Sequence, residues 1–276
     1  LLLALAWVRL AAVDAALTEA AIGGGLTGVL LIRAAVRLRQ TEAVSRAETP
    51  GPLFRVMAAL VAAGIAAALA VVVLSLPEPG PTLAPHVAQH IATTGLGNAV
   101  TAVLLSFRAI DTLLEAVVLI FALIAVWTLT PDRFWGELPG PKYETDPNGM
   151  LAYLARLLPP IGIVVAVYVL WVGADLPGGK FQAGTLLAAM WLLAIMASLT
   201  EAPPISRRWL RGMLVAGTVV FLVIGFAGVP LAGAFLAYPE GYAKPLIIAI
   251  EAASMASIAF TLALLVLGPP ERSDRP

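Results

Sequence analysis

The sequence predicts an all-α fold, a polytopic transmembrane bundle of about 7–9 membrane helices, because apolar stretches of about 20 residues recur along it. Hydrophobic residues make up 60% of the 276 residues, and charged residues only 12%. The mean hydropathy is +0.93. These values are typical of multi-pass membrane proteins and exclude a water-soluble domain.

The composition also limits the chemistry. The chain has no cysteine and two histidines, which excludes iron–sulfur clusters, thiolate zinc sites and disulfides, and leaves few ligands for haem. Basic and acidic residues are equal at 17 each, so no net field attracts nucleic acid. No nucleophile with a base, Walker motif or metal-ligand cluster is present in the sequence, so we expect no enzyme, no cofactor and no metal.

The first module spans residues 1–130. Residues 1–8 resemble the end of an apolar helix without the features of a signal peptide, so we expect the chain to be a fragment of something longer. A proline-rich loop, 77–85, ends the second full crossing because proline cannot continue a helix. The apolar segments expected here are 1–8, 14–35, 53–76 and the charge-bearing segment 96–129.

A polar linker, 131–150, is the predicted boundary to a second module, 151–268, and a polar tail follows at 269–276. The second module is expected to hold four membrane helices. Their ranges are 151–172, 183–199, 209–228 and 245–267.

The positive-inside rule places two groups of arginines in the cytoplasm. They are Arg33, Arg37, Arg39, Arg46 and Arg55 in the first module, and Arg207, Arg208 and Arg211 in the second. Both groups of arginines can lie in the cytoplasm only if segment 96–129 makes one net crossing. A straight helix over it would measure about 51 Å, beyond a hydrocarbon core of about 30 Å. We therefore expect a break near Phe107 and Arg108, or a hairpin of opposite parity.

Arg108, Asp111 and Glu115 lie within this segment at i, i+3 and i+7, so they form one stripe on one helix face. A charge at the bilayer centre costs roughly 2.5–3.5 kcal/mol on insertion scales. The stripe is therefore a candidate ion or proton path, or else an ion-pair network that holds a kinked helix against its neighbours.

Two more acids open the first full crossing, with three glycines, 23–25, shortly after them. Asp14 and Glu19 are five residues apart, about 140° around a helix, so we expect them on different faces. Asp14 fits a helix N-cap, whereas Glu19 lies deeper. The glycines are expected to bend the helix or let another approach closely.

Glu251 lies inside the last crossing and is either a polar contact between helices or a path residue. Lys244, at the mouth of that crossing, is expected to pair with Glu240 at the surface. His90 is either a hydrogen-bonded loop residue or a pH-responsive group at the mouth of the path. The sequence Pro-Gly-Gly-Lys-Phe, 177–181, is sufficiently explained as a tight bend.

Three motifs together resemble the multisubunit Mrp-type sodium/proton antiporters and related membrane subunits of membrane-bound hydrogenases. Residues 14–23 are similar to the D-x-A-x-T-E-A-x-x-G pattern in the C-terminal part of the large first subunit of Mrp antiporters. Residues 107–115 are similar to F-R-x-x-D-T-x-x-E in the same part. Residues 177–181 resemble the P-G-G-G-F turn of the second Mrp subunit, which suggests that the two subunits are fused here.

The resemblance implies that Glu19, Asp111 and Glu115 belong to a polar path between antiporter-like subunits, with Arg108 holding it in register. Three positions depart from the pattern. Ser106 stands where an aspartate is frequent, Ala174 where a histidine is frequent, and Lys180 where a glycine is usual. Any ion role of the turn, including Lys180 as a residue at the mouth of the path, is thereby less secure.

The sequence thus predicts a membrane subunit of a multisubunit Na+/H+ antiporter in a bacterial or archaeal cell membrane. The expected partners are other subunits, the transported ions Na+ and H+, and lipid. The expected path residues are Asp14, Glu19, Arg108, Asp111, Glu115 and Glu251. Two rivals are the membrane arm of a redox-driven pump and a structural adaptor without transport residues.

Overall fold

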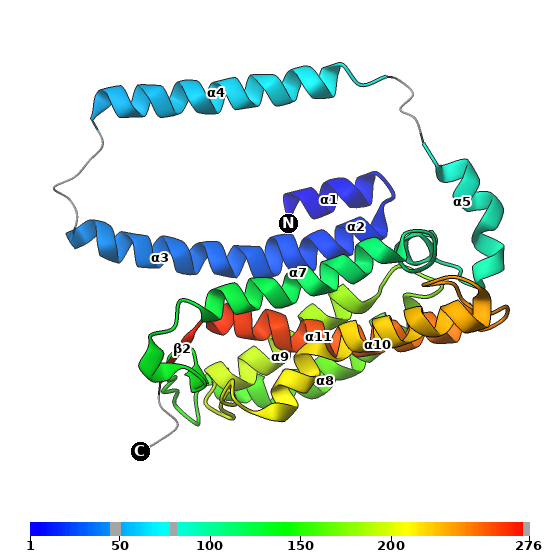
Figure 1. The fold of residues 1–276 in the computed structure, drawn as a ribbon. Coiled ribbons are helices and arrows are strands. Elements are labelled where there is room, and N and C mark those ends of the chain that lie inside the picture. The colour runs from blue at the N-terminus through cyan, green and yellow to red at the C-terminus, as the bar shows by residue number, and fades with distance from the viewer. Residues whose placement is uncertain (45–50, 78–81, 273–276) are drawn as a thin grey trace. The chain divides into compact units, whose positions relative to one another are not determined.

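The computed structural model describes residues 1–44, 51–77 and 82–272. Arg46, part of the proline-rich loop and the last four residues of the tail lie outside this part. The described chain separates into two compact units, residues 1–30 with 88–276, and residues 31–87. The all-α prediction is confirmed, since helices account for nearly all of the regular structure (Figure 1).

The first module consists of helices of mixed type. Its α-helices are α1 (Leu2–Arg9), α2 (Val13–Thr18), α3 (Gly28–Val44), α4 (Pro52–Leu74), α5 (Ala84–His90), α6 (Ala99–Ala102) and α7 (Ala109–Trp127). π-Helices occupy Glu19–Thr27 and Val103–Phe107, and a 3₁₀ turn occupies Ile91–Thr94.

The second module contains four α-helices and, with the linker, the two short strands. The helices are α8 (Met150–Val172), α9 (Lys180–Met196), α10 (Arg208–Ala232) and α11 (Ala243–Leu267). Strand β1 (Leu138–Pro139) pairs antiparallel with β2 (Pro270–Arg272), and a 3₁₀ turn lies at Asp132–Phe134. The linker and the beginning of the tail are thus joined to each other, and both belong to the larger unit.

By length and composition, six described helices can cross a membrane, or seven if one bent pair counts as a span. The pair is Ala84–Thr94 with Ala99–Phe107, bent by 89°. Helix α9 has 17 residues and is shorter than these. It begins at Lys180, earlier than the expected residue 183, because Gly179 with φ +129° ends the preceding turn.

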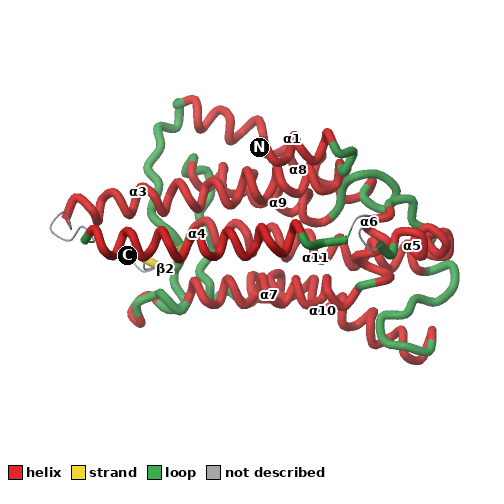
Figure 2. Tube along the Cα trace, turned by 90° about the horizontal axis from the view of Figure 1, so that it is seen from above, coloured by secondary structure: helices red, strands yellow, loops and turns green. Residues whose placement is uncertain are grey.

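Helix α11 is the most buried of the candidate spans and packs against α7, α8, α9 and α10 (Figures 1 and 2). Small residues permit close approach: a Cβ on Gly217 of α10 would lie 2.7 Å from the Cα of Ser254 on α11. Such backbone proximity is the usual way in which membrane helices associate. Helix α11 therefore forms the axis around which the site is assembled.

Segment 96–129 contains one spanning helix, α7, and is broken at Arg108, as its length predicts. The start of α7 shares a core cluster with Phe221 and Ile247. Its end, at Trp127, shares another with Leu210 near the start of α10. Helix α7 is therefore long and apolar enough for one crossing, and its end lies near the start of α10.

Candidate functional site

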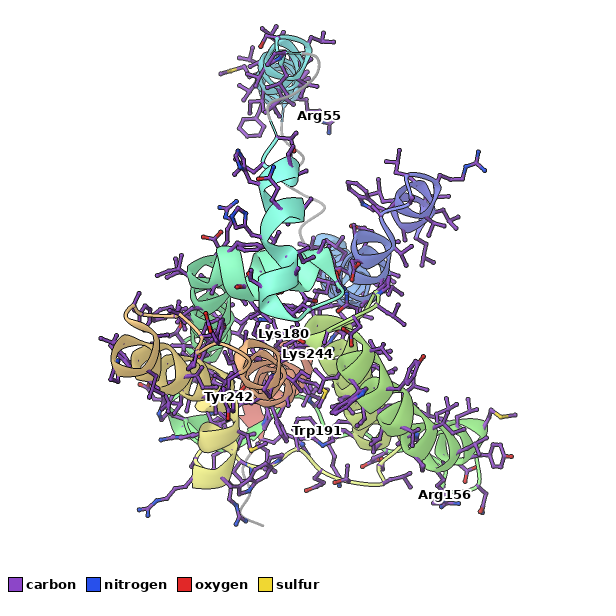
Figure 3. The ribbon with its side chains drawn as sticks, turned by 90° about the vertical axis from the view of Figure 1, so that its right-hand side faces the viewer. Arg55, Arg156, Lys180, Trp191, Tyr242 and Lys244 are labelled. Carbon is purple, nitrogen blue, oxygen red and sulfur yellow. The ribbon has the colours of Figure 1, made fainter. Side chains whose placement is uncertain are left out.

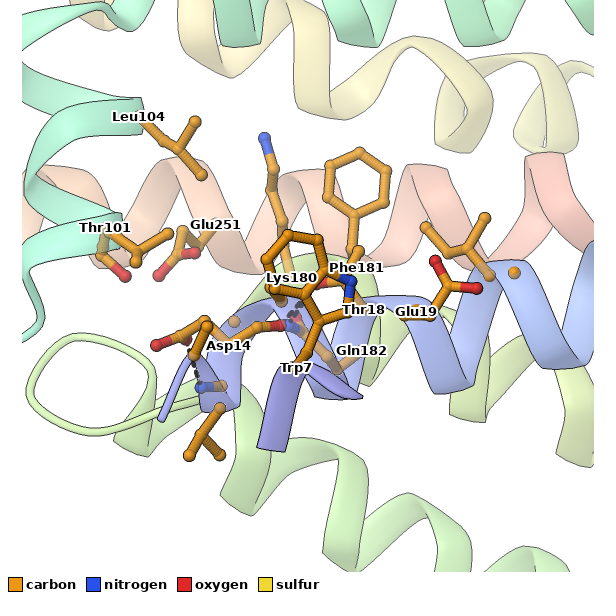
Figure 4. A pocket seen from close by; sticks show the side chains of 18 of the residues that line it. Trp7, Asp14, Thr18, Glu19, Thr101, Leu104, Lys180, Phe181, Gln182 and Glu251 are labelled. Atoms are coloured by element: carbon orange, nitrogen blue, oxygen red, sulfur yellow. Dashed lines mark hydrogen bonds between the residues drawn. The ribbon is translucent and has the colours of Figure 1, made fainter. Parts of the chain in front are cut away.

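A cleft of about 650 Å³ opens between the N-terminal helices and the second module (Figure 4). Four charged side chains line it, from α2, the following π-helix, α9 and α11. They are Asp14, Glu19, Lys180 and Glu251. Polar side chains from three elements accompany them, namely Thr18, Thr101 and Gln182. The cleft thus combines residues that are more than 200 positions apart in sequence.

Asp14 does not cap its helix, contrary to the sequence interpretation, because the N-cap of α2 is Ala12. Its Oδ1 atom instead accepts hydrogen bonds from the Asn98 side chain at 3.1 Å and from the backbone N–H of Gly178 at 3.2 Å. Asp14 therefore fastens α2 to the turn between α8 and α9.

Glu19 begins the π-helix, and its carboxylate lies directly over Gly23, where a Cβ atom would collide with Oε1. Asp14 and Glu19, which the sequence places on different faces of a regular helix, both line the cleft. Asp14 projects from α2, and Glu19 projects from the first residue of the π-helix that follows it. At least one of the three glycines provides room for a carboxylate.

Glu251 and Lys180 form the buried part of the site, with 4% and 6% of their surfaces exposed. The carboxylate of Glu251 accepts the backbone N–H of Lys180. It also lies beside Gly179, where a Cβ would be 3.3 Å from Oε1. The turn that the sequence explains as a bend therefore also holds two carboxylates, one through Gly178 and one through Lys180.

Lys180 is within electrostatic reach of two acids, Glu251 on α11 and Glu115 on α7. Its ammonium lies 5.2 Å from the centre of the Phe181 ring, a distance at which a cation and an aromatic face attract each other. Figure 3 shows Lys180 close to the middle of the bundle and Arg156 at its edge. The residue that departs from the family pattern is thus central to the site.

Hydroxyl and amide groups hold the lining in place. Gln182 donates to Thr18 Oγ1 at 2.9 Å, which joins α9 to α2. Thr101 donates to the carbonyl of Gly173 at 2.6 Å, which joins α6 to the end of α8. Sequence reasoning missed these residues, because polar side chains in an apolar helix carry no sign of their distant partners.

The stripe on α7 lies outside the cleft. Arg108 and Asp111 form an ion pair of 2.6 Å, with 69% and 47% of their side chains exposed. Glu115 is also exposed in the isolated chain. The three residues therefore form the expected stripe, but they face outward from this chain.

His90 is exposed at the end of α5 and does not line the cleft. Lys244 does not pair with Glu240 as expected; it binds both carboxylate oxygens of Asp175 at 2.7 Å. The hydrogen bonds from Lys244 hold the pKa of Asp175 below its ordinary value.

In the loop before α11, burial raises the pKa of Tyr238 to about 12. The Tyr238 hydroxyl donates to the Leu105 carbonyl at 2.7 Å.

No three His, Cys, Asp or Glu side chains in the part of the chain that the structure describes gather closely enough to hold a metal ion. The charged groups of the cleft are instead three acids, two of which accept a backbone N–H, and one lysine. Such groups can exchange protons or attract a cation.

Family comparison matches residues 150–269 to a domain related to the MnhB subunit of Na+/H+ antiporters. Residues 1–40 match the MbhD family of MBH subunits. Among solved structures, a chain of the Mrp complex from Dietzia sp. covers 99% of this chain at 25% identity with a TM-score of 0.66. The chain is thus similar to Mrp-type antiporter subunits, in sequence over residues 150–269 and in fold over nearly its whole length.

Two further similarities extend over parts of the chain. A chain of the archaeal membrane-bound sulfane sulfur reductase covers 78% of it, with 24% identity and a TM-score of 0.64. An uncharacterised protein of Methanocaldococcus jannaschii is 27% identical over half of the chain. The chain spans 59% of the length of that protein, 32% of the Dietzia chain and 99% of the reductase chain.

Proposed function

We propose that this chain is a membrane subunit of a multisubunit antiporter that exchanges Na+ for protons, and that its cleft forms part of the path for one of these ions. The observation that carries the proposal is the convergence of Asp14, Glu19, Lys180 and Glu251 on one cleft inside an otherwise apolar bundle. In this proposal the chain acts in transport and not as an enzyme.

The energetics favour a path over incidental polarity. An ionisable side chain within the membrane is costly and is typically a functional group with a partner. Three acids face one lysine in the cleft, so with all groups charged it carries a net negative charge that attracts cations. The buried Glu251 is the group best placed to be a specific acceptor.

The outward stripe on α7 supports a role in coupling to neighbouring subunits. Arg108, Asp111 and Glu115 are exposed in the single chain, and charges that face lipid are unfavourable. A neighbouring subunit that covers the stripe removes this cost. We therefore propose other subunits of the complex as partners, in the cell membrane of a bacterium or archaeon.

A second candidate function is the membrane arm of a redox-driven ion pump. The match to the MbhD family and the fold shared with a sulfane sulfur reductase chain favour it. This candidate requires an iron–sulfur module that purifies together with the chain. Visible absorbance and iron content of the purified complex therefore distinguish a redox-driven pump from an antiporter.

The decisive experiment measures Na+-driven proton movement in inverted vesicles that carry the whole complex. Glu251→Gln and Glu115→Gln are compared with wild type after a native gel has shown equal assembly. We expect a loss of about 100-fold or more for an essential proton-transferring group. The matched control is Glu240→Gln, since Glu240 is an exposed loop acid. Unchanged exchange in both variants would refute the path and favour a structural adaptor.

A further inference from the structure

A second, smaller cavity lies behind the cleft, between α7, α9, α10 and α11. Its volume is about 10 Å³, approximately the space that one water molecule requires. Part of its lining is polar, from Thr218, Ser254, Ser257 and Thr261. Dry cavities in proteins are apolar, whereas a polar cavity of this size is suited to a bound water.

Lys180 lines both the cleft and this cavity. Its side chain runs away from Asp14 and Gln182, and its ammonium end lies beside Phe181, which also lines both spaces (Figure 4). Glu115, on α7 next to the cavity residue Ala116, is within electrostatic reach of the ammonium. Lys180 therefore connects the cleft side of the bundle with α7.

Two buried polar atoms on α11 lack hydrogen-bond partners, Oε2 of Glu251 and Oγ of Ser254. Both residues are more than nine-tenths buried, and their spacing of three residues places them on one face of the helix. An unsatisfied buried polar atom costs about 1–3 kcal/mol, so each points to a ligand with hydrogen-bonding capacity.

Ser257, one turn further along α11, also lines this cavity, but its hydroxyl has hydrogen-bond partners. Its Oγ accepts the backbone N–H of Gly217 at 2.8 Å and donates to the carbonyl of Met213 at 2.8 Å. The vacant hydrogen-bonding capacity is therefore at Ser254, next to Lys180 and Glu251, and not spread evenly along the helix.

We propose that the cavity binds one water molecule between Lys180 and Ser254, and that this water carries protons from Glu251 toward Glu115. The proposal rests on the function proposed above, and it adds that protons and not Na+ move through this part of the path. Lys180 lines this cavity, and its ammonium repels another cation at such short range. This branch therefore conducts protons and excludes Na+.

The proton balance is closed within the chain. Lys180 gives a proton to the Glu115 carboxylate and takes one from the water, and the water is restored by the proton of the Glu251 carboxyl. One O–H bond is lost at Glu251 and one is gained at Glu115. No oxidant, reductant or further reactant is required.

The test uses the whole complex in inverted vesicles with four variants. Ser254→Ala and Lys180→Met are expected to lower Na+-driven proton movement by about tenfold or more at equal assembly, because each removes a group that binds the water. Lys180→Arg keeps the charge but cannot give up a proton, because a guanidinium stays protonated, so it is expected to lose exchange as Lys180→Met does. The control is Thr185→Val, which removes an α9 hydroxyl that bonds only within its helix and should leave exchange unchanged.

A structural measurement accompanies the kinetics. A cryo-EM map of the wild-type complex that resolves waters should show one peak within hydrogen-bond distance of both Ser254 Oγ and Lys180 Nζ. No such peak, or normal exchange in Ser254→Ala and Lys180→Met, overturns the proposal. If Glu251→Gln still stops exchange in that case, the cleft path stands and only this branch is refuted; if it does not, the proposed function fails as well.

Discussion

Glu251 of α11 accepts the backbone N–H of Lys180, the first residue of α9. The N-terminus of a helix carries a partial positive charge that stabilises a carboxylate. On the preceding residues of the same turn, the N–H of Gly178 bonds to Asp14. Two acids from distant parts of the chain are thus held by one five-residue turn, which explains why the cleft forms at this point.

Gly23→Ala should displace the Glu19 carboxylate, because the new Cβ would occupy the position of its Oε1 atom. Alanine is the better helix former by about 0.8–1.0 kcal/mol, so the helix itself should not weaken. We expect Na+-driven proton movement to fall several-fold while assembly is retained.

The matched control is Gly28→Ala, where nothing lies within 4 Å of the added Cβ. Exchange in this variant should equal that of wild type. An equal loss in both variants would mean that glycine is needed for backbone conformation, and that the position of Glu19 is not the cause.

The ion pair between Asp175 and Lys244 predicts a dependence of stability on pH. The pKa of Asp175 is lowered in the folded protein, so the pair stabilises above the ordinary value of 3.8 and this contribution is lost as pH falls through the folded pKa. Both side chains are partly exposed, and we expect Asp175→Asn to cost about 0.2–1 kcal/mol at neutral pH.

The measurement is thermal unfolding of the detergent-solubilised complex between about pH 7 and pH 3. Wild type and Asp175→Asn should differ at neutral pH and converge in acid. Glu144→Gln serves as control, since Glu144 pairs with Lys142 only at 3.7 Å and is 84% exposed. A difference between wild type and Asp175→Asn that persists at the acid end would contradict the assignment.

The sequence predicts the helices well because membrane spans depend on a local property, the length of an apolar stretch. The break at Arg108 is also predictable, since 34 residues exceed what one straight helix needs to cross. The position of Glu251 inside the last span also follows from the length of the apolar stretch around it. These features require no knowledge of which helices are neighbours.

The assembly of the cleft is not predictable in this way. Asp14 and Gly178 are 164 residues apart, and nothing in either segment specifies the other. The π-helix that begins at Glu19 arises without an evident change in composition. Lys180, considered a departure from the family pattern, becomes central only when α7 and α11 are placed beside it.

Ser257→Ala should destabilise the contact between α10 and α11. The Ser257 hydroxyl is inserted between the N–H of Gly217 and the carbonyl of Met213, which would otherwise pair with each other at i→i−4. We expect the free energy of unfolding to fall by between about 0.6 kcal/mol, the average for hydrogen bonds between membrane helices, and about 1.7 kcal/mol, the maximum. The loss is limited because the N–H of Gly217 and the carbonyl of Met213 can then bond to each other. Unfolding in detergent or mixed micelles measures this free energy, and a loss far above about 1.7 kcal/mol would show that the two backbone groups do not bond to each other in the variant.

The stripe on α7 should face a neighbouring subunit. The chain has no cysteine, so Val118→Cys introduces a single labelling site three residues after Glu115, on the same face, and leaves all charges in place. A benzophenone attached there should cross-link to another subunit of the complex in native membranes. Val164→Cys on α8 is the matched control, since Val164 is 69% exposed within an apolar stretch.

We expect the probe at Val118→Cys to cross-link to protein and the probe at Val164→Cys to cross-link to lipid. The reason is that only Val118 lies beside charged groups that lipid cannot solvate. If Val118→Cys also labels lipid alone, the Arg108–Asp111 pair would have to remain in hydrocarbon without a partner. The pair is 2.6 Å long and largely exposed, so it would then neutralise itself, and the stripe would no longer support coupling between subunits. The cleft proposal does not depend on this outcome, since none of its charged residues lies on the stripe.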